Sequence, residues 1–73
     1  MFTLRDMLNV NKEGGLQMSH FSERLKSLRQ QSSITQAKLA DDLNVTKSLI
    51  SMYESGQRLP SFEMLEAIAD YFN

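Results

Sequence analysis

Residues 35–55, which read TQAKLADDLNVTKSLISMYES, hold two short amphipathic helical patterns separated by a tight polar turn. Their apolar positions are Ala37, Leu39, Ala40 and Leu43 in the first pattern and Leu49, Ile50 and Tyr53 in the second. The turn contains Asn44, which tolerates a left-handed backbone at low cost, and Val45, which can be buried at the corner. Thr46 then occupies the position of a helix N-cap. We therefore predict two helices joined by a tight turn.

The second of these helices opens with three polar residues and a methionine on the side away from its apolar stripe. These residues are Lys47, Ser48, Ser51 and Met52. A short helix that buries one face and presents small polar groups at its N-terminal end fits the DNA major groove. The pattern therefore predicts sequence-specific binding of double-stranded DNA.

Helical patterns also flank this pair. The first spans His20–Gln31, with Ser19 as its expected N-cap and a buried stripe of Phe21, Leu25 and Leu28. Thr35 is the expected cap of the next helix, Gly56 ends the third, and Ser61 caps the last after Pro60. The expected apolar side of the last helix consists of Phe62, Leu65, Ile68, Ala69 and Phe72. No strand pattern is evident, and we predict an all-α domain of four helices.

Residues 1–17 read differently from the rest of the chain. The apolar residues Phe2, Leu4, Met7, Leu8 and Val10 fit a brief amphipathic helix, ended by Asn11 and the pair Gly14-Gly15. The codons for residues 12–15 can also form a purine-rich ribosome-binding site in the messenger RNA. Met18 follows after a short gap, where a start codon is expected. One hypothesis is therefore an upstream segment read through ahead of a natural start at Met18. The alternative is an ordinary N-terminal helix with a glycine linker, and both stay open.

Composition bounds the function further. A chain of 73 residues with 41% apolar residues fits one small folded domain and excludes a disordered composition. The absence of cysteine excludes disulfides, thiol nucleophiles and thiolate metal sites. No membrane-spanning or secretory segment is evident, so a cytoplasmic location is expected.

Catalytic patterns are missing as well. His20 is the single histidine and lies at a helix start, where a surface role is expected, and the adjacent Asp41 and Asp42 point apart on a helix as a solvated face. Without a phosphate loop, a nucleophile–base pair or a ligand cluster, we predict no enzyme activity, no cofactor and no metal.

The charge is unevenly distributed along the chain. The net charge is −1, but residues 24–58 carry six basic and three acidic residues (+3), while residues 59–73 carry three acidic residues and no basic one (−3). The basic part coincides with the predicted DNA-binding helices. Because few cations are present to neutralise phosphates, a single copy should bind DNA weakly. We therefore expect a homodimer on two half-sites.

The stretch from about residue 20 to residue 73 resembles the Cro and repressor-type helix-turn-helix family, also called lambda repressor-like or XRE. The resemblance rests on four motifs in order: a first helix with basic residues ending at Arg29, T-Q-x-x-L-A from Thr35, V-T-x-x-x-I-S-x-Y-E-x-G from Val45, and P-S-x-x-x-L-x-x-I-A from Pro60. It implies a lambda repressor-like four-helix fold over residues 18–73 that acts as a dimeric bacterial or phage repressor of transcription. Members usually have a fifth helix, so the domain is expected to be truncated before it.

The resemblance also implies roles for individual residues. Base edges are read by Lys47, Ser48, Ser51 and Met52; phosphates are contacted by Gln36, Thr46, Gly56, Gln57 and Arg58. Arg29 and Glu54 match a structural ion pair between the first and third helices. Position 47 is lysine where arginine is frequent, which keeps the charge but loses bidentate geometry.

Two other functions use the same motifs. One is an antitoxin of a toxin–antitoxin pair, which would bind DNA with the same face and mask a toxin with another surface. The second is a protein-interaction module on this fold that has lost DNA binding, which the low net charge permits. A neighbouring toxin gene would favour the first, and absence of DNA binding at low salt would favour the second.

Overall fold

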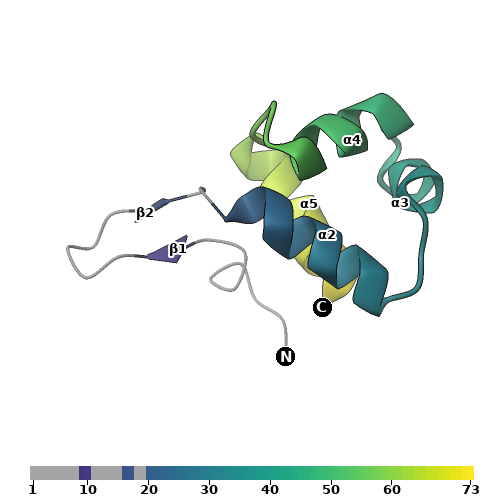
Figure 1. Cartoon of the computed structure of the whole chain (residues 1–73), viewed down its shortest axis with the longest axis horizontal. Helices are drawn as coiled ribbons and strands as arrows, with labels where there is room; N and C mark the ends of the chain where they lie inside the picture. The colour runs from purple at the N-terminus through teal and green to yellow at the C-terminus, as the bar shows by residue number, and fades with distance from the viewer. Residues whose placement is uncertain (1–8, 11–15, 18–19) are drawn as a thin grey trace.

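The computed structural model describes residues 9–10, 16–17 and 20–73. Within these ranges the chain forms four helices, labelled as in Figure 1: α2 (Phe21–Gln31), α3 (Gln36–Leu43), α4 (Lys47–Ser55) and α5 (Phe62–Phe72). Helices α2 and α4 lie against each other, α3 packs against α4, and α5 closes the group behind α2. The predicted all-α domain of four helices is confirmed.

The corner between α3 and α4 forms as its residues predict. Asn44 ends α3 with a left-handed backbone at φ 60°, and the Val45 N–H donates to the Ala40 carbonyl at 2.9 Å. The Thr46 hydroxyl then accepts a hydrogen bond from the Leu49 N–H at 3.1 Å, which confirms the predicted N-cap. Thr35 caps α3 in the same way through the Lys38 N–H. The two caps and the left-handed residue fix how α4 leaves α3.

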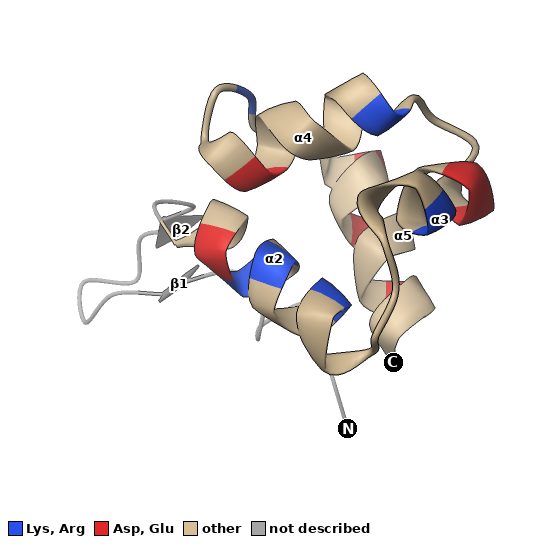
Figure 2. Cartoon of the chain, turned by 45° about the vertical axis from the view of Figure 1, so that its right-hand side comes forward, with Lys and Arg blue, Asp and Glu red and all other residues tan. Residues whose placement is uncertain are grey.

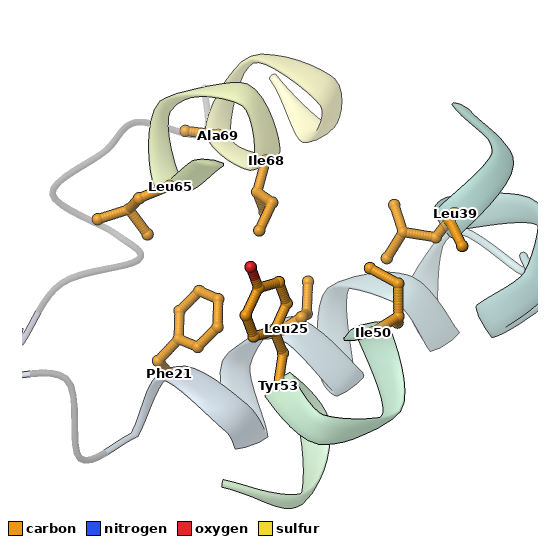
Figure 3. Close-up of a cluster of buried hydrophobic side chains, with 9 residues drawn as sticks. Phe21, Leu25, Leu39, Ile50, Tyr53, Leu65, Ile68 and Ala69 are labelled. Carbon is orange, nitrogen blue, oxygen red and sulfur yellow. The ribbon is translucent and has the colours of Figure 1, made fainter. Parts of the chain in front are cut away.

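The core lies where the four helices meet (Figure 3). Its buried members are Phe21, Leu25, Leu39, Ala40, Ile50, Tyr53, Leu65, Ile68 and Ala69. Tyr53 of α4 packs edge-to-face on Phe21 of α2, with ring centroids 6.0 Å apart at 82°. Burial raises the pKa of the Tyr53 hydroxyl. Because Ile50 and Tyr53 are both buried, the opposite face of α4 must point outward.

Helix α5 follows the predicted pattern with one exception. Ser61 caps it by accepting from the Met64 N–H, and Leu65, Ile68 and Ala69 are buried. Phe72 packs against the core as a partly buried side chain. Phe62, however, is 63% exposed, so its assignment to the buried side was wrong. The prediction fails there because periodicity groups residues on one face without showing that a neighbouring helix reaches the first turn.

A hydrogen bond links the end of α5 to α3. The Tyr71 hydroxyl donates to the Asp42 carboxylate at 2.6 Å, and the Lys38 ammonium lies 3.0 Å from the other carboxylate oxygen. The Tyr71 hydroxyl, and after it Lys38, holds the pKa of Asp42 below its ordinary value, while Asp42 raises the pKa of Tyr71. Asp42 is exposed, as expected for a solvated face, and its side chain also joins two helices.

The start of the domain differs from the sequence expectation. Helix α2 begins at Phe21, with His20 at the N-cap position and no side-chain cap, whereas Ser19, the predicted cap, lies outside the described residues. The His20 ring lies 3.8 Å from the Glu23 carboxylate on the surface.

Part of residues 1–17 forms strands where the sequence predicted none. Two two-residue strands, β1 (Asn9–Val10) and β2 (Leu16–Gln17), pair antiparallel with Val10 opposite Leu16. Val10 therefore does not belong to the predicted N-terminal helix, whose other residues lie outside the described ranges. The missed signal is the pair Gly14-Gly15 in the stretch between the apolar residues Val10 and Leu16, since such a pair is as typical of a hairpin turn as of a helix end.

Candidate nucleic-acid interface

Helix α4 presents two different faces. Ile50 and Tyr53 anchor it in the core at 0% and 4% exposure, while Lys47, Ser48 and Ser51 are exposed on the outer face. The structure therefore brings three of the four predicted base-reading residues together at a solvent-facing surface. This surface combines one ammonium group with two hydroxyl groups, which suits the donors and acceptors of base edges.

Met52 differs from the other three predicted base-reading residues. It is half-buried, and its backbone carbonyl accepts the N–H groups of Gln57 and Arg58 at 2.9 and 3.3 Å. Its carbonyl thereby holds the loop after α4 against the helix end. The backbone of Met52 thus has a structural role that the sequence spacing did not reveal.

Four of the five predicted phosphate contacts lie at the two ends of α4. Thr46 caps its N-terminus, while Gly56, Gln57 and Arg58 form the exposed loop at its C-terminus. Gly56 has a left-handed backbone at φ 80°, and among the described residues the only atom within 4 Å of an added Cβ would be Ser22 Oγ at 3.9 Å. Glycine is therefore needed for its backbone conformation rather than for space. The loop consequently turns sharply and places Arg58 beside the helix end.

An ion pair links α2 to α4 beneath this surface. Arg29 Nε lies 2.6 Å from Glu54 Oε2, and Arg29 Nη2 donates to Glu54 Oε1 at 3.1 Å. The third guanidinium nitrogen, Nη1, donates to the Ile34 carbonyl at 2.9 Å. The two side chains are 13% and 4% exposed, and the hydrogen bond to Glu54 raises the pKa of Arg29. Three donors of one guanidinium therefore fix the relative position of α2, α4 and the turn before α3.

Gln36 joins the same carboxylate. Its amide nitrogen Nε2 donates to Glu54 Oε1 at 3.1 Å. A carboxylate only accepts, so this contact requires the amide nitrogen, not the amide oxygen, to face Glu54. One N–H of Gln36 is thereby used inside the protein and its second N–H is left for another acceptor. Sequence reasoning assigned Gln36 to a phosphate but missed Glu54, because no local signal joins residues 18 positions apart.

These residues surround a cleft of about 340 Å³ that opens to solvent. It is lined by Lys26, Arg29, Gln36, Ser51, Glu54 and Ser55. The cleft therefore brings a predicted base-reading residue, Ser51, and a predicted phosphate contact, Gln36, to one place on the surface.

The charges divide the molecule in the same way. Figure 2 shows both basic and acidic positions on α2, α3 and α4 and a basic position in the loop after α4, whereas α5 carries acidic positions and no basic one. Within the described residues no cluster of three or more metal-ligating side chains occurs, and no helix is long and apolar enough to cross a membrane. Helices α2 and α4 and the loop after α4 together hold five of the six Lys and Arg residues that the structure describes, which suits this side to a polyanion.

Comparison with known proteins agrees with this geometry. A family model described as helix-turn-helix matches residues 25–73. The chain belongs to the helix-turn-helix family. This confirms the resemblance drawn from the motifs, and α3 and α4 are the two helices of the helix-turn-helix unit.

Curated relatives of this helix-turn-helix domain carry names of transcription regulators. They include a transcriptional activator, BcrR, of Enterococcus faecalis (40% identical over 53 residues) and an uncharacterised regulator, YqaE, of Bacillus subtilis (40% over 50 residues). A third is the transcriptional repressor RstR of the cryptic phage CTXphi in Vibrio cholerae (42% over 48 residues).

The aligned stretches cover 73%, 68% and 66% of this chain but only 26%, 43% and 43% of those relatives. The chain therefore spans less than half the length of each of these proteins. No solved structure matched the chain.

Proposed function

We propose that this helix-turn-helix domain binds specific DNA sequences as part of a transcription regulator. Helix α4 enters the major groove, and Lys47, Ser48 and Ser51 read base edges there. Gln36 and the two ends of α4 contact phosphates on either side. The observation that carries this proposal is the division of α4 into a buried face at Ile50 and Tyr53 and an exposed polar face.

The family and the relatives support the same function. All three relatives are named as transcription regulators, one as an activator and one as a repressor. Repression by occupying a promoter is the outcome that we propose for this binding. We expect a homodimer on a palindromic operator because the net charge of −1 leaves one copy few phosphate-neutralising cations.

The decisive experiment selects duplexes from a random pool with the full 73-residue chain and then compares variants on the selected duplex. The double variant Lys47→Ala, Ser48→Ala should lose more of its discrimination between the selected duplex and a scrambled one than of its total affinity. The reason is that contacts to bases determine sequence specificity, whereas contacts to phosphates position the protein on the duplex. A matched control, Arg24→Ala with Ser27→Ala, removes one cation and one hydroxyl from exposed positions of α2. Unchanged discrimination in the α4 variant would refute the base-reading role.

The low net charge also favours the protein-interaction module as a second candidate. The acidic α5, with Glu63, Glu66 and Asp70, is unsuited to DNA and suits a basic protein surface. A gel shift at low salt separates the two candidates, since a module that has lost DNA binding shifts no duplex from the random pool.

A further inference from the structure

Lys26 lines the cleft between α2 and α4 and has no role in the function proposed so far. Its neighbours around the cleft include Gln36, a proposed phosphate contact, and Ser51, a proposed base-reading residue. Lys26 itself is exposed, and among the residues that the structure describes it takes part in no ion pair. Lys26 therefore lies next to two proposed DNA contacts, and no carboxylate of the described residues is paired with its charge.

The charge of the cleft depends on this residue. Arg29 and Glu54 form its floor as an ion pair, and the Glu54 side chain is only 4% exposed. Their charges offset each other at short range, so the lining, with two cations and one carboxylate, has a net charge of +1 that resides on Lys26. A cleft with one uncompensated cation and an amide donor attracts an anion of phosphate type.

The position of Lys26 along α2 agrees with this. Ser22, Lys26 and Arg29 share one helix face by their spacing. Ser22 lies near Gly56 and Arg29 binds Glu54, so this face follows the last turn of α4 and the start of its loop. Lys26 thus lies between proposed phosphate contacts, Gln36 on one side and residues 56–58 on the other.

We propose that Lys26 contacts the DNA backbone and that the cleft receives one of its phosphodiester groups. The Lys26 ammonium and the second amide N–H of Gln36 are the donors, while Glu54 holds the amide of Gln36 in orientation. This inference rests on the proposed DNA binding. It adds a phosphate contact from α2, outside the helix-turn-helix unit itself.

The test measures binding of the full chain to the selected duplex over a range of salt concentrations. Lys26→Ala should weaken binding about fivefold and lower the slope of log K against log salt by about 1, equally on selected and scrambled duplexes. Lys26→Arg should restore most of the affinity and the slope. The matched control is Arg24→Ala, which removes an exposed cation from the same helix at a position that does not line the cleft.

The outcomes separate this inference from the function on which it rests. If the wild-type chain binds the duplex and Lys26→Ala behaves as Arg24→Ala does, the cleft is not a phosphate site. If the wild-type chain binds no duplex, the proposed function itself fails and the phosphate site fails with it. Circular dichroism of both alanine variants checks that the helices are retained, which is expected because alanine favours a helix at an exposed position.

Discussion

Glu54 is the residue on which the interface depends most. Its carboxylate accepts from both Arg29 and Gln36 while its side chain is almost fully buried. Glu54→Gln keeps the shape of the side chain but leaves the guanidinium of Arg29 without a counter-charge. We expect it to lower the free energy of unfolding by about 3 kcal/mol, since removing one partner strands the other charge.

Urea unfolding of a double variant provides the comparison for Glu54→Gln. Arg29→Met with Glu54→Leu removes both charges together and should cost less than Glu54→Gln alone. An equal or larger loss in the double variant would show that the pair stabilises the fold beyond avoiding a stranded charge.

Gln36 gives a second prediction at the residue scale. Gln36→Ala removes the amide donor from the cleft and should weaken binding to all duplexes alike, because phosphate contacts carry no sequence information. Binding isotherms on the selected and scrambled duplexes measure this. A loss confined to one base change in the selected duplex would contradict the phosphate assignment.

At the scale of one element, α5 shows how far periodicity predicts burial. Leu65 and Phe62 belong to the same predicted apolar side, but Leu65 is 2% exposed and Phe62 is 63% exposed. Leu65→Ala should therefore cost about 2–5 kcal/mol of unfolding free energy, and Phe62→Ala less than about 0.5 kcal/mol. Chemical unfolding of the two variants checks this, and similar losses would mean that Phe62 is covered in solution.

Contact between α3 and α5 is expected to depend on pH. The pKa of Asp42 is held below its ordinary 3.8 in the folded protein. Its contribution to the free energy of unfolding is therefore fully present above pH 3.8 and is lost as the pH falls through the lowered pKa. The pKa of Tyr71 is raised above its ordinary 10.0 in the folded protein. Its contribution to the free energy of unfolding is therefore fully present below pH 10.0 and is lost as the pH rises through the raised pKa.

Tyr71→Phe removes the hydroxyl donor and isolates this contact. The pKa of Asp42, followed by NMR of its carboxyl carbon, should rise towards the ordinary value in the variant, with Lys38 still lowering it in part. The stability difference between wild type and variant should be present near neutral pH and vanish in strong acid. A difference that persists in strong acid would assign the effect to packing of the ring instead.

Over the whole molecule, the sequence predicted those features that depend on residues close together in the chain. Threonine and serine caps, the left-handed Asn44 and the glycine after α4 are local signals, and they located α3, α4 and α5. Contacts between distant residues were predictable only where a family motif held them, as for Arg29 with Glu54. Gln36 with Glu54, Asp42 with Tyr71, and the lining of the cleft by Lys26 depend on how helices pack, which no local pattern encodes.

The charge of the whole molecule leads to a prediction about assembly on DNA. Because one copy has few cations for phosphates, two copies on one face of the duplex should bind more tightly than either alone. For a selected palindrome with half-sites about one helical turn apart, inserting about five base pairs at its centre places the half-sites on opposite faces. Gel shifts should then show weaker binding and loss of the steep dependence on protein concentration. A half-site duplex is the control, and equal affinity for both spacings would mean that the copies bind independently.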